Sequence, residues 1–389
     1  MKYKLSEIAL FNPTETLKKG TLAKKVGMDK LQSFCRDIPD YEIAEFSGGT
    51  KFRNGDTIMA RITPCLENGK TAKVNILDTE EVGFGSTEYI VFRAIDGVTD
   101  EDYLYYLVCS PIVRDIAIKS MVGSSGRQRV QTDVVKGIEV ELPTLDEQRK
   151  IGSLLKSLDD KIAVNNKINE NLEQQAQSYF QELFVDNADP EWAIGTISDL
   201  GTVVGGSTPS KAKPEYYTES GIAWITPKDL SINKSKFVSH GENDITDLGL
   251  KNSSAAIMPE GTVLFSSRAP IGYIAIATDE VTTNQGFKSV VPKPEIGTPF
   301  VYFFLKNTLP VIEGMASGST FKEVSGSTMK NVPAVIPDAE TLAKFSDFCA
   351  PIFVQQRILE EQNQSLATLR DNLLPKLMSG EIDVSAVQL

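Results

Sequence analysis

The chain has 389 residues, of which 41% are hydrophobic and 24% are charged, and its formal net charge is −12. This length accommodates two or three domains, and the composition is that of an ordinary globular protein. No apolar run is long enough to span a membrane, and the charged start "MKYKLSEIAL" differs from a signal peptide. We therefore expect a cytoplasmic protein without a membrane partner.

Histidine and cysteine usage excludes several catalytic classes. The single histidine, His240, lies in the polar stretch "FVSHGEND", where we expect it to be solvated. Ser-His-Asp and Cys-His systems could run only through this residue, and no HExxH zinc motif is present. The four cysteines show no CxxC spacing, which favours buried, reduced thiols over a zinc site or a disulfide.

The acidic charge is unevenly distributed along the chain. Residues 1–144 contain 19 basic and 21 acidic side chains, and residues 190–337 contain 12 and 14. Residues 145–189 contain 5 and 9, and residues 338–389 contain 4 and 8. Two nearly neutral segments can each present a basic face to nucleic acid. The acidic connectors would avoid a phosphate backbone and suit a protein partner.

The sequence contains an internal repeat. Residues 121–143, "MVGSSGRQRVQTDVVKGIEVELP", and residues 315–337, "MASGSTFKEVSGSTMKNVPAVIP", share a Gly/Ser loop, a valine, a lysine and a closing proline at an offset of 194. Upstream, "DYLYYLVCS" matches "PFVYFFLKN" at an offset of 197, and "FRNGDTIMARI" matches "MPEGTVLFSSR" at 206. An offset that changes in steps indicates loop insertions, so we expect a tandem duplication of a globular unit followed by a helix.

Each globular unit has a mixed pattern of strands and helices. Short β-branched or aromatic runs such as "DTIMARI", "EYIVFRA", "TVLFSS" and "IGYIAIAT" alternate with Gly, Pro and Asn turns. One apolar helix per unit is predicted, over residues 101–120 and over residues 297–315. The predicted fold class is therefore mixed α/β (α+β), with two globular units separated by an antiparallel pair of long helices in a pseudo-two-fold tandem repeat.

A long polar helix is predicted after each unit. Thr144 and Glu147 have the spacing of a capping box at the start of the first helix. A stripe that steps by four and three residues continues through both helices in the same register, which indicates coiled-coil packing. The predicted seam consists of Leu155, Leu158, Ile162, Asn169 and Leu172 in the first helix and Ile352, Leu359, Asn363, Leu366 and Leu373 in the second.

The seam carries one asparagine per helix at the same repeat position, Asn169 and Asn363. A buried polar residue in such a seam fixes the register and the partner at some cost in stability. The alternative is that both asparagines face solvent near a helix end, and the residues alone leave both interpretations open.

The length of the second helix sets the expected separation of the two units. Pro351 is expected to limit this helix to residues 351–378, which gives roughly 40 Å at about 1.5 Å per residue. An antiparallel pair would hold two similar units apart at a separation that suits DNA half-sites about one turn, roughly 34–36 Å, from each other.

The motifs that could carry chemistry are incomplete. Gly69-Lys70-Thr71 resembles the end of a P-loop, but Pro64 stands where the first glycine is needed, and "GFGSTE" ends in Glu88 instead of glycine. The charges in "IPDAETLAK" fit a helix start better than a nuclease site. We therefore predict no catalytic residue, no metal site and no cofactor.

Polar and basic loops are better represented. Arg pairs with guanine and Gln with adenine, whereas Ser, Thr and Lys hold phosphate, so the loops "GSSGRQRVQ", "GGSTPSKAK", "WITPKDL" and "SSRAPIG" are candidates for DNA contact, with ordinary solvated turns as the alternative. The candidate DNA-binding residues are Arg61, Lys70, Ser124, Ser125, Arg127, Gln128 and Arg129 in the first unit and Thr208, Lys211, Lys213, Lys228, Arg268, Ser319 and Lys322 in the second.

These motifs resemble those of type I restriction-modification system specificity (S) subunits. The second unit resembles a target recognition domain through "GGSTPSKAK", "AWITPKDL", "DITDLGLKNSSAAIMPEGTVLFSSRAPIGYIAIA" and "TTNQGF", in that order. "LPTLDEQRKIGSLLKSLDDKI" resembles the central conserved region, and "LRDNLLPKLMSGEIDV" the distal one. The first unit matches more loosely, through "FRNGDTIMARITPCLENGK" and "STEYIVFR". The resemblance covers essentially the whole chain.

The resemblance implies a subunit that does no chemistry itself. Each recognition domain would read one half of an asymmetric, bipartite site in double-stranded DNA. The helices would set the gap and dock two modification (methyltransferase) subunits, which carry S-adenosylmethionine and methylate adenine. Restriction (translocase/nuclease) subunits add ATP-driven cleavage in that family, and whether they join is left open. No cofactor is expected on this chain.

The expected domains are residues 1–144 and 187–337 for target recognition, residues 145–186 for the central spacer helix, and residues 338–389 for the distal helix and tail. Two other classes of protein, a nuclease and a helical scaffold, would behave differently from a specificity subunit. A nuclease with an unrecognised site would cleave DNA unaided. A helical scaffold that holds two proteins would show no sequence-dependent DNA binding, and the basic loop at residues 119–136 argues against it.

Overall fold

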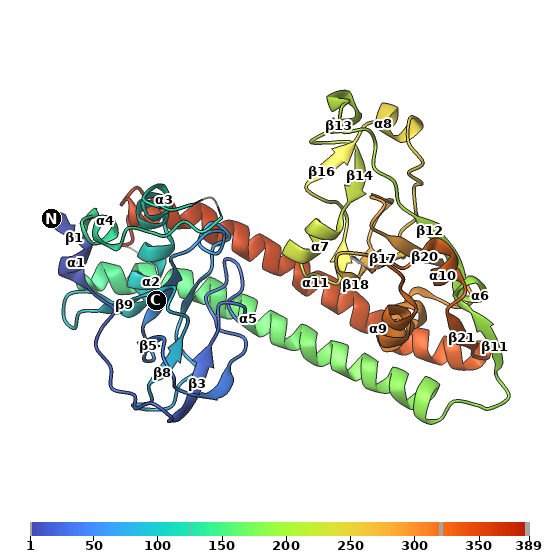
Figure 1. Ribbon diagram of the computed structural model, residues 1–389, viewed down its shortest axis with the longest axis horizontal. Helices are drawn as coiled ribbons and strands as arrows, with labels where there is room; N and C mark the ends of the chain where they lie inside the picture. Colours follow the sequence, from blue (N-terminus) through green and yellow to red (C-terminus); the bar gives the residue numbers. More distant parts are fainter. Residues whose placement is uncertain (1, 125, 319–321, 386–389) are drawn as a thin grey trace. The chain divides into compact units, whose positions relative to one another are not determined.

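The computed structural model describes residues 2–124, 126–318 and 322–385. The chain forms two compact units (Figure 1): unit 1 comprises Met1–Val164 and Gln362–Leu389, and unit 2 comprises Asn165–Glu361. Both boundaries lie inside long helices, so each long helix contributes to both units. Within the described ranges, no helix is long and apolar enough to cross a membrane.

Unit 1 is built from short strands and short helices. Its sheets have the strand orders β2-β9-β6-β7, β4-β3-β8-β5 and β1-β10. The elements are β1 (Lys2–Lys4), α1 (Leu5–Ile8), β2 (Ala9–Phe11), β3 (Leu22–Val26), β4 (Glu42–Glu45), β5 (Thr50–Phe52), β6 (Thr57–Ala60), β7 (Thr71–Lys73), β8 (Gly83–Gly85), β9 (Tyr89–Ala94), α2 (Glu101–Cys109), α3 (Pro111–Lys119), α4 (Thr132–Lys136) and β10 (Glu139–Glu141).

Unit 2 has the sheet orders β12-β20-β17-β18-β15, β13-β16-β14-β19 and β11-β21. Its elements are β11 (Ala193–Thr196), α6 (Ile197–Leu200), β12 (Gly201–Gly205), η2 (Pro214–Tyr216), β13 (Tyr217–Thr218), β14 (Ile222–Ile225), α7 (Pro227–Ile232), β15 (Phe237–Val238), β16 (Asn243–Ile245), α8 (Asp247–Lys251), β17 (Val263–Ser267), β18 (Ile271–Ala277), β19 (Thr282–Thr283), β20 (Lys288–Pro292), α9 (Thr298–Met315), α10 (Gly326–Lys330) and β21 (Pro333–Ile336).

The two units share one strand topology. The order β2-β9-β6-β7 in unit 1 corresponds to β12-β20-β17-β18 in unit 2, and β4-β3-β8 corresponds to β16-β14-β19. The parallel pairs β3–β8 and β14–β19 occupy the same place in each sheet. Each unit also closes by pairing its first strand with its last, β1 with β10 and β11 with β21. The predicted mixed α/β class and tandem repeat are therefore confirmed.

Two long helices follow the closing strands of the units. Helix α5 spans Leu145–Gln181 and continues as a π-helical turn, Glu182–Asp186, and α11 spans Ala339–Met378. The predicted capping box is confirmed, because the Thr144 backbone N–H donates to Glu147 Oε2 at 2.8 Å and the Glu147 backbone N–H donates to Thr144 Oγ1 at 3.4 Å. These bonds satisfy polar groups that a helix start leaves unpaired.

The two helices pack antiparallel within each unit. In unit 1 the early part of α5 meets the late part of α11, as the 2.6 Å contact between Asp159 and Arg370 shows. In unit 2 the late part of α5 meets the early part of α11, where Gln356 Nε2 donates to the Asn169 carbonyl at 3.1 Å. Leu155, Ile352 and Leu359 are buried at the predicted seam, and Leu158, Ile162, Asn169, Leu172, Asn363, Leu366 and Leu373 are half-buried.

Each unit buries its own hydrophobic core against these helices. In unit 1, Leu155 of α5 and Leu377 of α11 pack with the buried aromatic side chains of α2. In unit 2, Phe180 of α5 packs against Phe300 of α9 and Phe345 of α11, with ring centroids 5.8 Å apart in each of these two pairs. Aromatic rings at this spacing contribute packing energy beyond the area they bury.

Two helix predictions are wrong. Residues 101–120 form two helices, α2 and α3, instead of one, because Pro111 disfavours helical backbone at Ser110 and lacks the N–H for a continuing bond. Pro351 does not limit the second helix, which begins at Ala339. Pro351 is exposed, so the carbonyl it leaves unpaired can reach solvent, while Cys349 and Ile352 anchor the helix in the core of unit 2.

Candidate nucleic-acid interface

The Gly/Ser loop of unit 1 is a tight turn whose backbone is hydrogen-bonded to Arg61 and Thr63. The backbone N–H and C=O of Arg129 bond with those of Val122 at 2.9 and 3.0 Å, and Thr63 N–H donates to the Gln128 carbonyl at 3.0 Å. Gly123 has a φ of +137°, and a Cβ there would lie 2.9 Å from the Arg127 carbonyl oxygen. Glycine is therefore required at this point of the turn.

Arg129 is held by the carboxylate of Glu88, the residue just before β9. Its Nη2 lies 2.7 Å from Glu88 Oε1, its Nε lies 3.0 Å from both carboxylate oxygens, and Arg61 Nε lies 3.4 Å from Oε2. The hydrogen bond from Arg129 holds the pKa of Glu88 below its usual range, although burial opposes this. The same bond raises the pKa of Arg129. The structure therefore brings Arg61 and Arg129 together around one carboxylate.

The corresponding place in unit 2 has the same backbone connections with different charges. Ser317 and Glu323 exchange backbone hydrogen bonds at 2.8 and 3.1 Å, as Val122 and Arg129 do. Val324 N–H donates to the Ser267 carbonyl at 2.9 Å, which matches the Val130–Arg61 bond at 2.8 Å. Here the loop supplies the carboxylate, Glu323, and the facing segment supplies the cation.

Two cations approach Glu323. Arg268 Nη1 lies 3.5 Å from Oε2, and Lys288 Nζ lies 3.9 Å from Oε1. Burial lowers the pKa of Lys288. Nearby, the Thr208 hydroxyl is hydrogen-bonded to Gln285 Oε1, and the Gln285 carbonyl accepts from Lys288 at 3.4 Å. Thr208 and Arg268, both predicted contacts, thus lie around one polar cluster.

The remaining predicted contacts are more dispersed. Lys228 pairs with Glu242 at 2.6 Å, Lys213 pairs with Glu215 at 3.5 Å, and Lys70 donates to the Met28 carbonyl at 2.7 Å. The exposed residues among the others are Ser124, Arg127, Lys211 and Lys322, and Gln128 is half-buried. Ser125 and Ser319 lie outside the described residues.

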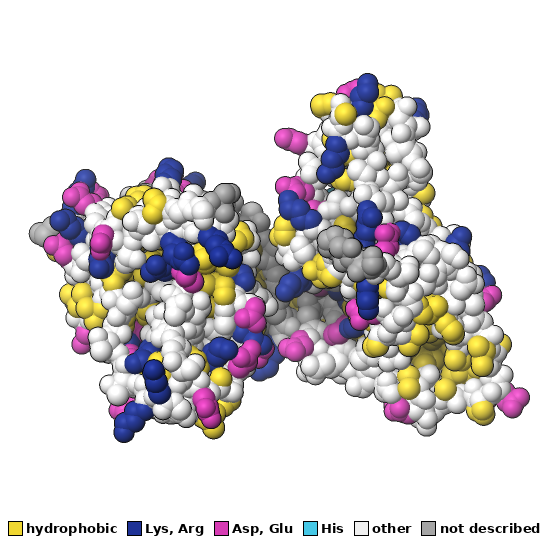
Figure 2. Space-filling view, in the orientation of Figure 1, with side chains coloured by type: hydrophobic (Ala, Val, Ile, Leu, Met, Phe, Trp, Pro, Cys, Tyr) yellow, Lys and Arg dark blue, Asp and Glu magenta, His cyan; other side chains and the backbone are white. Residues whose placement is uncertain are grey.

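The surface charges are mixed on the face seen in Figure 2. Lys and Arg side chains are scattered among Asp and Glu side chains on both units, without one continuous basic area in this view. On this face, therefore, basic side chains are grouped only locally. His240 is exposed and contacts only the neighbouring Ser239 hydroxyl, at 2.9 Å, among the described hydrogen bonds. No cluster of metal-ligating side chains occurs in the described part of the chain.

A buried polar cluster joins the helices of unit 1. Arg370 Nη1 lies 2.6 Å from Asp159 Oδ1, and the Tyr106 hydroxyl donates to Asp159 Oδ2 at 2.6 Å. Burial lowers the pKa of Arg370, but the charges and hydrogen bonds of Asp159 and Asp371 together outweigh burial and raise it. Arg370 also contacts Asp371 at 2.8 Å.

Unit 2 has a different polar cluster on its helices. Lys236 Nζ lies 2.8 Å from Glu173 Oε2 and 3.0 Å from Gln356 Oε1, and Lys306 pairs with the other oxygen of Glu173. The Lys236 side chain is only 7% exposed, and its Nζ lies 3.6 Å from the centroid of the Phe353 ring. Burial alone would raise the pKa of Glu173, but the two lysines lower it to about 2.

The sequence analysis does not identify Glu88, Glu323 or Lys236 as functional residues. Glu88 and Glu323 are not predicted as DNA contacts, because basic and amide side chains are the ones that pair with guanine, adenine and phosphate. The available signal was the repeat itself, since Glu323 stands at the position of Arg129. No local pattern marks Lys236, whose partners Glu173 and Gln356 are 63 and 120 residues away in the chain.

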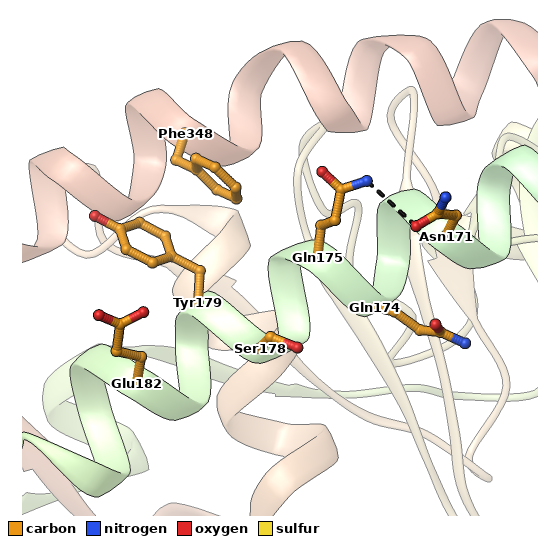
Figure 3. Close-up of a pocket in the computed structure, with 7 residues that line it drawn as sticks. All are labelled: Asn171, Gln174, Gln175, Ser178, Tyr179, Glu182 and Phe348. Atoms are coloured by element: carbon orange, nitrogen blue, oxygen red, sulfur yellow. Dashed lines mark hydrogen bonds between the residues drawn. The ribbon is translucent and has the colours of Figure 1, made fainter.

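A shallow polar cavity of about 430 Å³ lies along the helices of unit 2 (Figure 3). Tyr179 and Phe348 pack against each other in its lining, with ring centroids 4.6 Å apart. Gln175 Nε2 donates to Asn171 Oδ1 at 3.4 Å, and Glu182 is the one titratable carboxylate in the lining. The amide side chains can donate and accept hydrogen bonds from a polypeptide, but they do not titrate and so cannot act as an acid or a base.

The two units thus share the backbone hydrogen bonds of this loop and differ in its charges. The family model described as "Type I restriction modification DNA specificity domain" matches residues 1–174 and again residues 190–370. The chain therefore belongs to the type I restriction-modification DNA specificity family, as the resemblance of its motifs indicates.

Individual relatives agree with this assignment. Over 194 residues the chain is 38% identical to the type I restriction enzyme MjaIX specificity subunit of Methanocaldococcus jannaschii, a match that spans 48% of this chain and 45% of that relative. It is 24% identical over 407 residues to the type I restriction enzyme HindI specificity subunit of Haemophilus influenzae, covering 85% of this chain and 87% of the relative.

One solved structure supports the fold. A crystal structure of the type I restriction-modification system S subunit from M. genitalium aligns over 97% of this chain and 96% of that chain, with a TM-score of 0.57 and 16% identity. At this level of identity the likeness concerns the fold and not the residues that contact a ligand.

Proposed function

We propose that this chain is the DNA-recognition subunit of a type I restriction-modification complex. In this proposal residues 1–144 and 187–337 are target recognition domains, and each reads one half of an asymmetric, bipartite site in double-stranded DNA. The observation that carries the proposal is the repeated loop connection: the same backbone bonds hold Arg129 in unit 1 and Glu323 in unit 2. A conserved scaffold with exchanged charges suits two readers of different sequence.

The long helices have a separate proposed role. Residues 145–186 and 338–389 would set the non-specific gap and dock two modification subunits, which would bind S-adenosylmethionine and methylate adenine. The amides in the cavity of Figure 3 are exposed on α5, and the helices carry the excess acidic charge. Both features suit a protein partner better than a phosphate backbone. The chain itself would do no chemistry, and a restriction subunit would add cleavage where it joins.

The proposal is tested by co-expressing the chain with its modification subunit and mapping adenine methylation across a genome. A two-part motif with a fixed gap is expected. One continuous palindromic motif would contradict two separate readers. Cleavage of DNA by the purified chain with a divalent cation would instead identify a nuclease, and a complex without sequence-dependent DNA binding would identify a scaffold.

The assignment of individual loops is tested in the same assay. Arg127 is exposed in the loop of unit 1, and Arg129 follows two residues later. Arg127→Ala and Arg129→Ala are expected to relax one half of the motif only, with a loss of about 1–3 kcal/mol at each contacted base pair. Relaxation of both halves would mean that these arginines maintain structure instead of reading sequence.

A further inference from the structure

We infer that Glu88 and Glu323 are positioning residues for sequence readout, each orienting one arginine toward a base: Arg129 in unit 1 and Arg268 in unit 2. The inference rests on the proposed function, since it concerns how each recognition unit presents its arginine. Neither carboxylate would itself contact a guanine edge, because a carboxylate offers no donor to the two acceptors that guanine presents in the major groove.

The geometry in unit 1 leaves one edge of the guanidinium available. A guanidinium has five N–H donors in a fixed fork. Glu88 accepts from Nε and from one hydrogen of Nη2, so the end formed by Nη1 and the second Nη2 hydrogen points away from the carboxylate. That end can donate two parallel hydrogen bonds to guanine O6 and N7. The Arg129 side chain is 43% exposed, which leaves it accessible to such a ligand.

Backbone contacts fix the base of the same side chain. Arg129 is bridged to Val122 on one side and to Ile62 on the other. With both the backbone and the Nε edge held, the long side chain has few conformations to lose when DNA binds. Preorganisation of this kind increases selectivity because it reduces the cost of reaching the bound geometry.

Unit 2 also places an arginine beside a carboxylate at this loop, but Glu323 contacts Nη1 of Arg268, whereas Glu88 contacts Nε and Nη2 of Arg129. Arg268 is bridged to Glu323, at the place where Ile62 is bridged to Arg129 in unit 1. The loop position thus carries the cation in unit 1 and the anion in unit 2. Their partners stand at different positions of the repeat, because Glu88 bonds through its carbonyl to Arg61 as Gly286 bonds to Ser267 in unit 2. An isolated surface pair contributes little to stability, so stability alone does not account for an Arg–Glu pair at this loop in both units.

The two pairs differ in closeness. The Arg129–Glu88 contacts are 2.7–3.0 Å, whereas Arg268 lies 3.5 Å from Glu323 and shares that carboxylate with Lys288 at 3.9 Å. Arg268 is therefore less constrained before binding. The inference predicts stronger discrimination of its base pair by unit 1 than by unit 2.

The test uses the full complex of this chain with its modification subunit, first to define the methylated motif and then to compare variants on duplexes that differ at single base pairs. Glu88→Gln keeps the size of the side chain but removes its charge. It is expected to reduce discrimination at one base pair on the order of 10-fold, at the same base pair that Arg129→Ala relaxes. Adding Glu88→Gln to Arg129→Ala should have no further effect. Glu323→Gln and Arg268→Ala should share one base pair in the other half, with a smaller effect.

Several outcomes would overturn the inference. Glu88→Gln could leave the motif unchanged while Arg129→Ala relaxes it, or the two could affect different base pairs. The exchange Glu88→Arg with Arg129→Glu restores the ion pair in reverse and keeps the loop folded. A return of the original motif in that variant would identify a purely structural pair, whereas a changed base preference supports positioning. Glu88→Asp, which keeps the charge, serves where Glu88→Gln folds poorly and should relax the motif only partly.

Failure of the proposed function gives a separate signature. A wild-type complex that methylates no bipartite motif refutes the recognition role before any variant is made. Failure of the inference alone leaves the bipartite motif intact in the wild type and in Glu88→Gln.

Discussion

The polar clusters on the helices are built from different residues in the two units. In unit 1, Asp159 of α5 meets Arg370 of α11, and in unit 2, Glu173 of α5 meets Lys236 and Gln356. At the repeat offset of 194, however, Asp159 corresponds to Phe353, Arg370 to Ala176, Glu173 to Ala367 and Gln356 to Ile162. Each of these four polar residues is thus replaced by an apolar residue in the other unit.

This difference separates two roles of the helix sequences. The repeated apolar stripe makes the helices pair, and it would permit either half of α5 to pack on either half of α11. The unrepeated charges make the pairings distinct, because a wrong pairing would bury Asp159 or Glu173 without a cation, which is costly. The Gly/Ser loops of the two units likewise repeat the backbone hydrogen bonds but not the charges.

The largest expected effect comes from breaking one cluster at a time. Glu173→Gln leaves Lys236 buried without its carboxylate, and the loss is expected to be about 3–5 kcal/mol. Asp159→Asn should cost less, about 2 kcal/mol, because Arg370 retains Asp371 as a partner. Glu182→Gln, an exposed carboxylate change on the same chain, should stay within about 0.5 kcal/mol.

The chain offers a convenient readout for each unit. Both tryptophans, Trp192 and Trp224, lie in unit 2, so tryptophan fluorescence during urea unfolding reports on that unit, and circular dichroism reports on the whole chain. Glu173→Gln should shift the fluorescence transition, whereas Asp159→Asn should shift mainly the circular dichroism. Equal shifts of the fluorescence transition by both variants would contradict separate clusters.

A second expected effect concerns proline in the helices. At the repeat offset, Ser157 of α5 corresponds to Pro351 of α11, and both positions are exposed. Ser157→Pro removes a helical hydrogen bond in unit 1 and should destabilise it by about 3 kcal/mol or more. Pro351→Ser restores an N–H in unit 2 and should stabilise it by about 1 kcal/mol. Urea unfolding measures both, and a loss of stability in Pro351→Ser would mean that the helix requires the proline.

What the sequence could predict was local or repeated. The strands, α9 and the Thr144 cap depend on neighbours within a few residues, and the repeat organised the rest. The continuity of α11 through Pro351 was not predictable, because burial of Cys349 and Ile352 in a tertiary core outweighs the local cost of proline. Glu88 was missed for the same reason, since its partner Arg129 lies 41 residues away and meets it only after folding.

A third prediction follows from the lowered pKa of Glu173. Its ordinary pKa is 4.5, and in the folded chain it is about 2, so the carboxylate stabilises unit 2 fully above about pH 4.5. This contribution, about 3 kcal/mol from the two pKa values, is lost as the pH falls through about 2. Unfolding should be followed by fluorescence between about pH 5 and about pH 2, which includes both pKa values. The free energy of unfolding should depend less on pH in Glu173→Gln than in the wild type. The same slope in both proteins would show that other carboxylates dominate.

The smallest expected effect comes from substitutions that change the backbone of the Gly/Ser loops and leave their charges unchanged. Gly123 and Gly318 each follow the first bridged residue of their loop, Val122 and Ser317. Their φ values of +137° and +124° lie in a region that favours glycine. Gly123→Ala and Gly318→Ala should each cost about 1–2 kcal/mol through local strain. Gly123→Ala should also speed amide exchange at Arg129, whose N–H bonds to the Val122 carbonyl. Gly314→Ala, in open space on α9, should be neutral or stabilise by up to about 1 kcal/mol. Unchanged exchange at Arg129 in Gly123→Ala would mean that the ion pair with Glu88, rather than the turn, holds the loop in place.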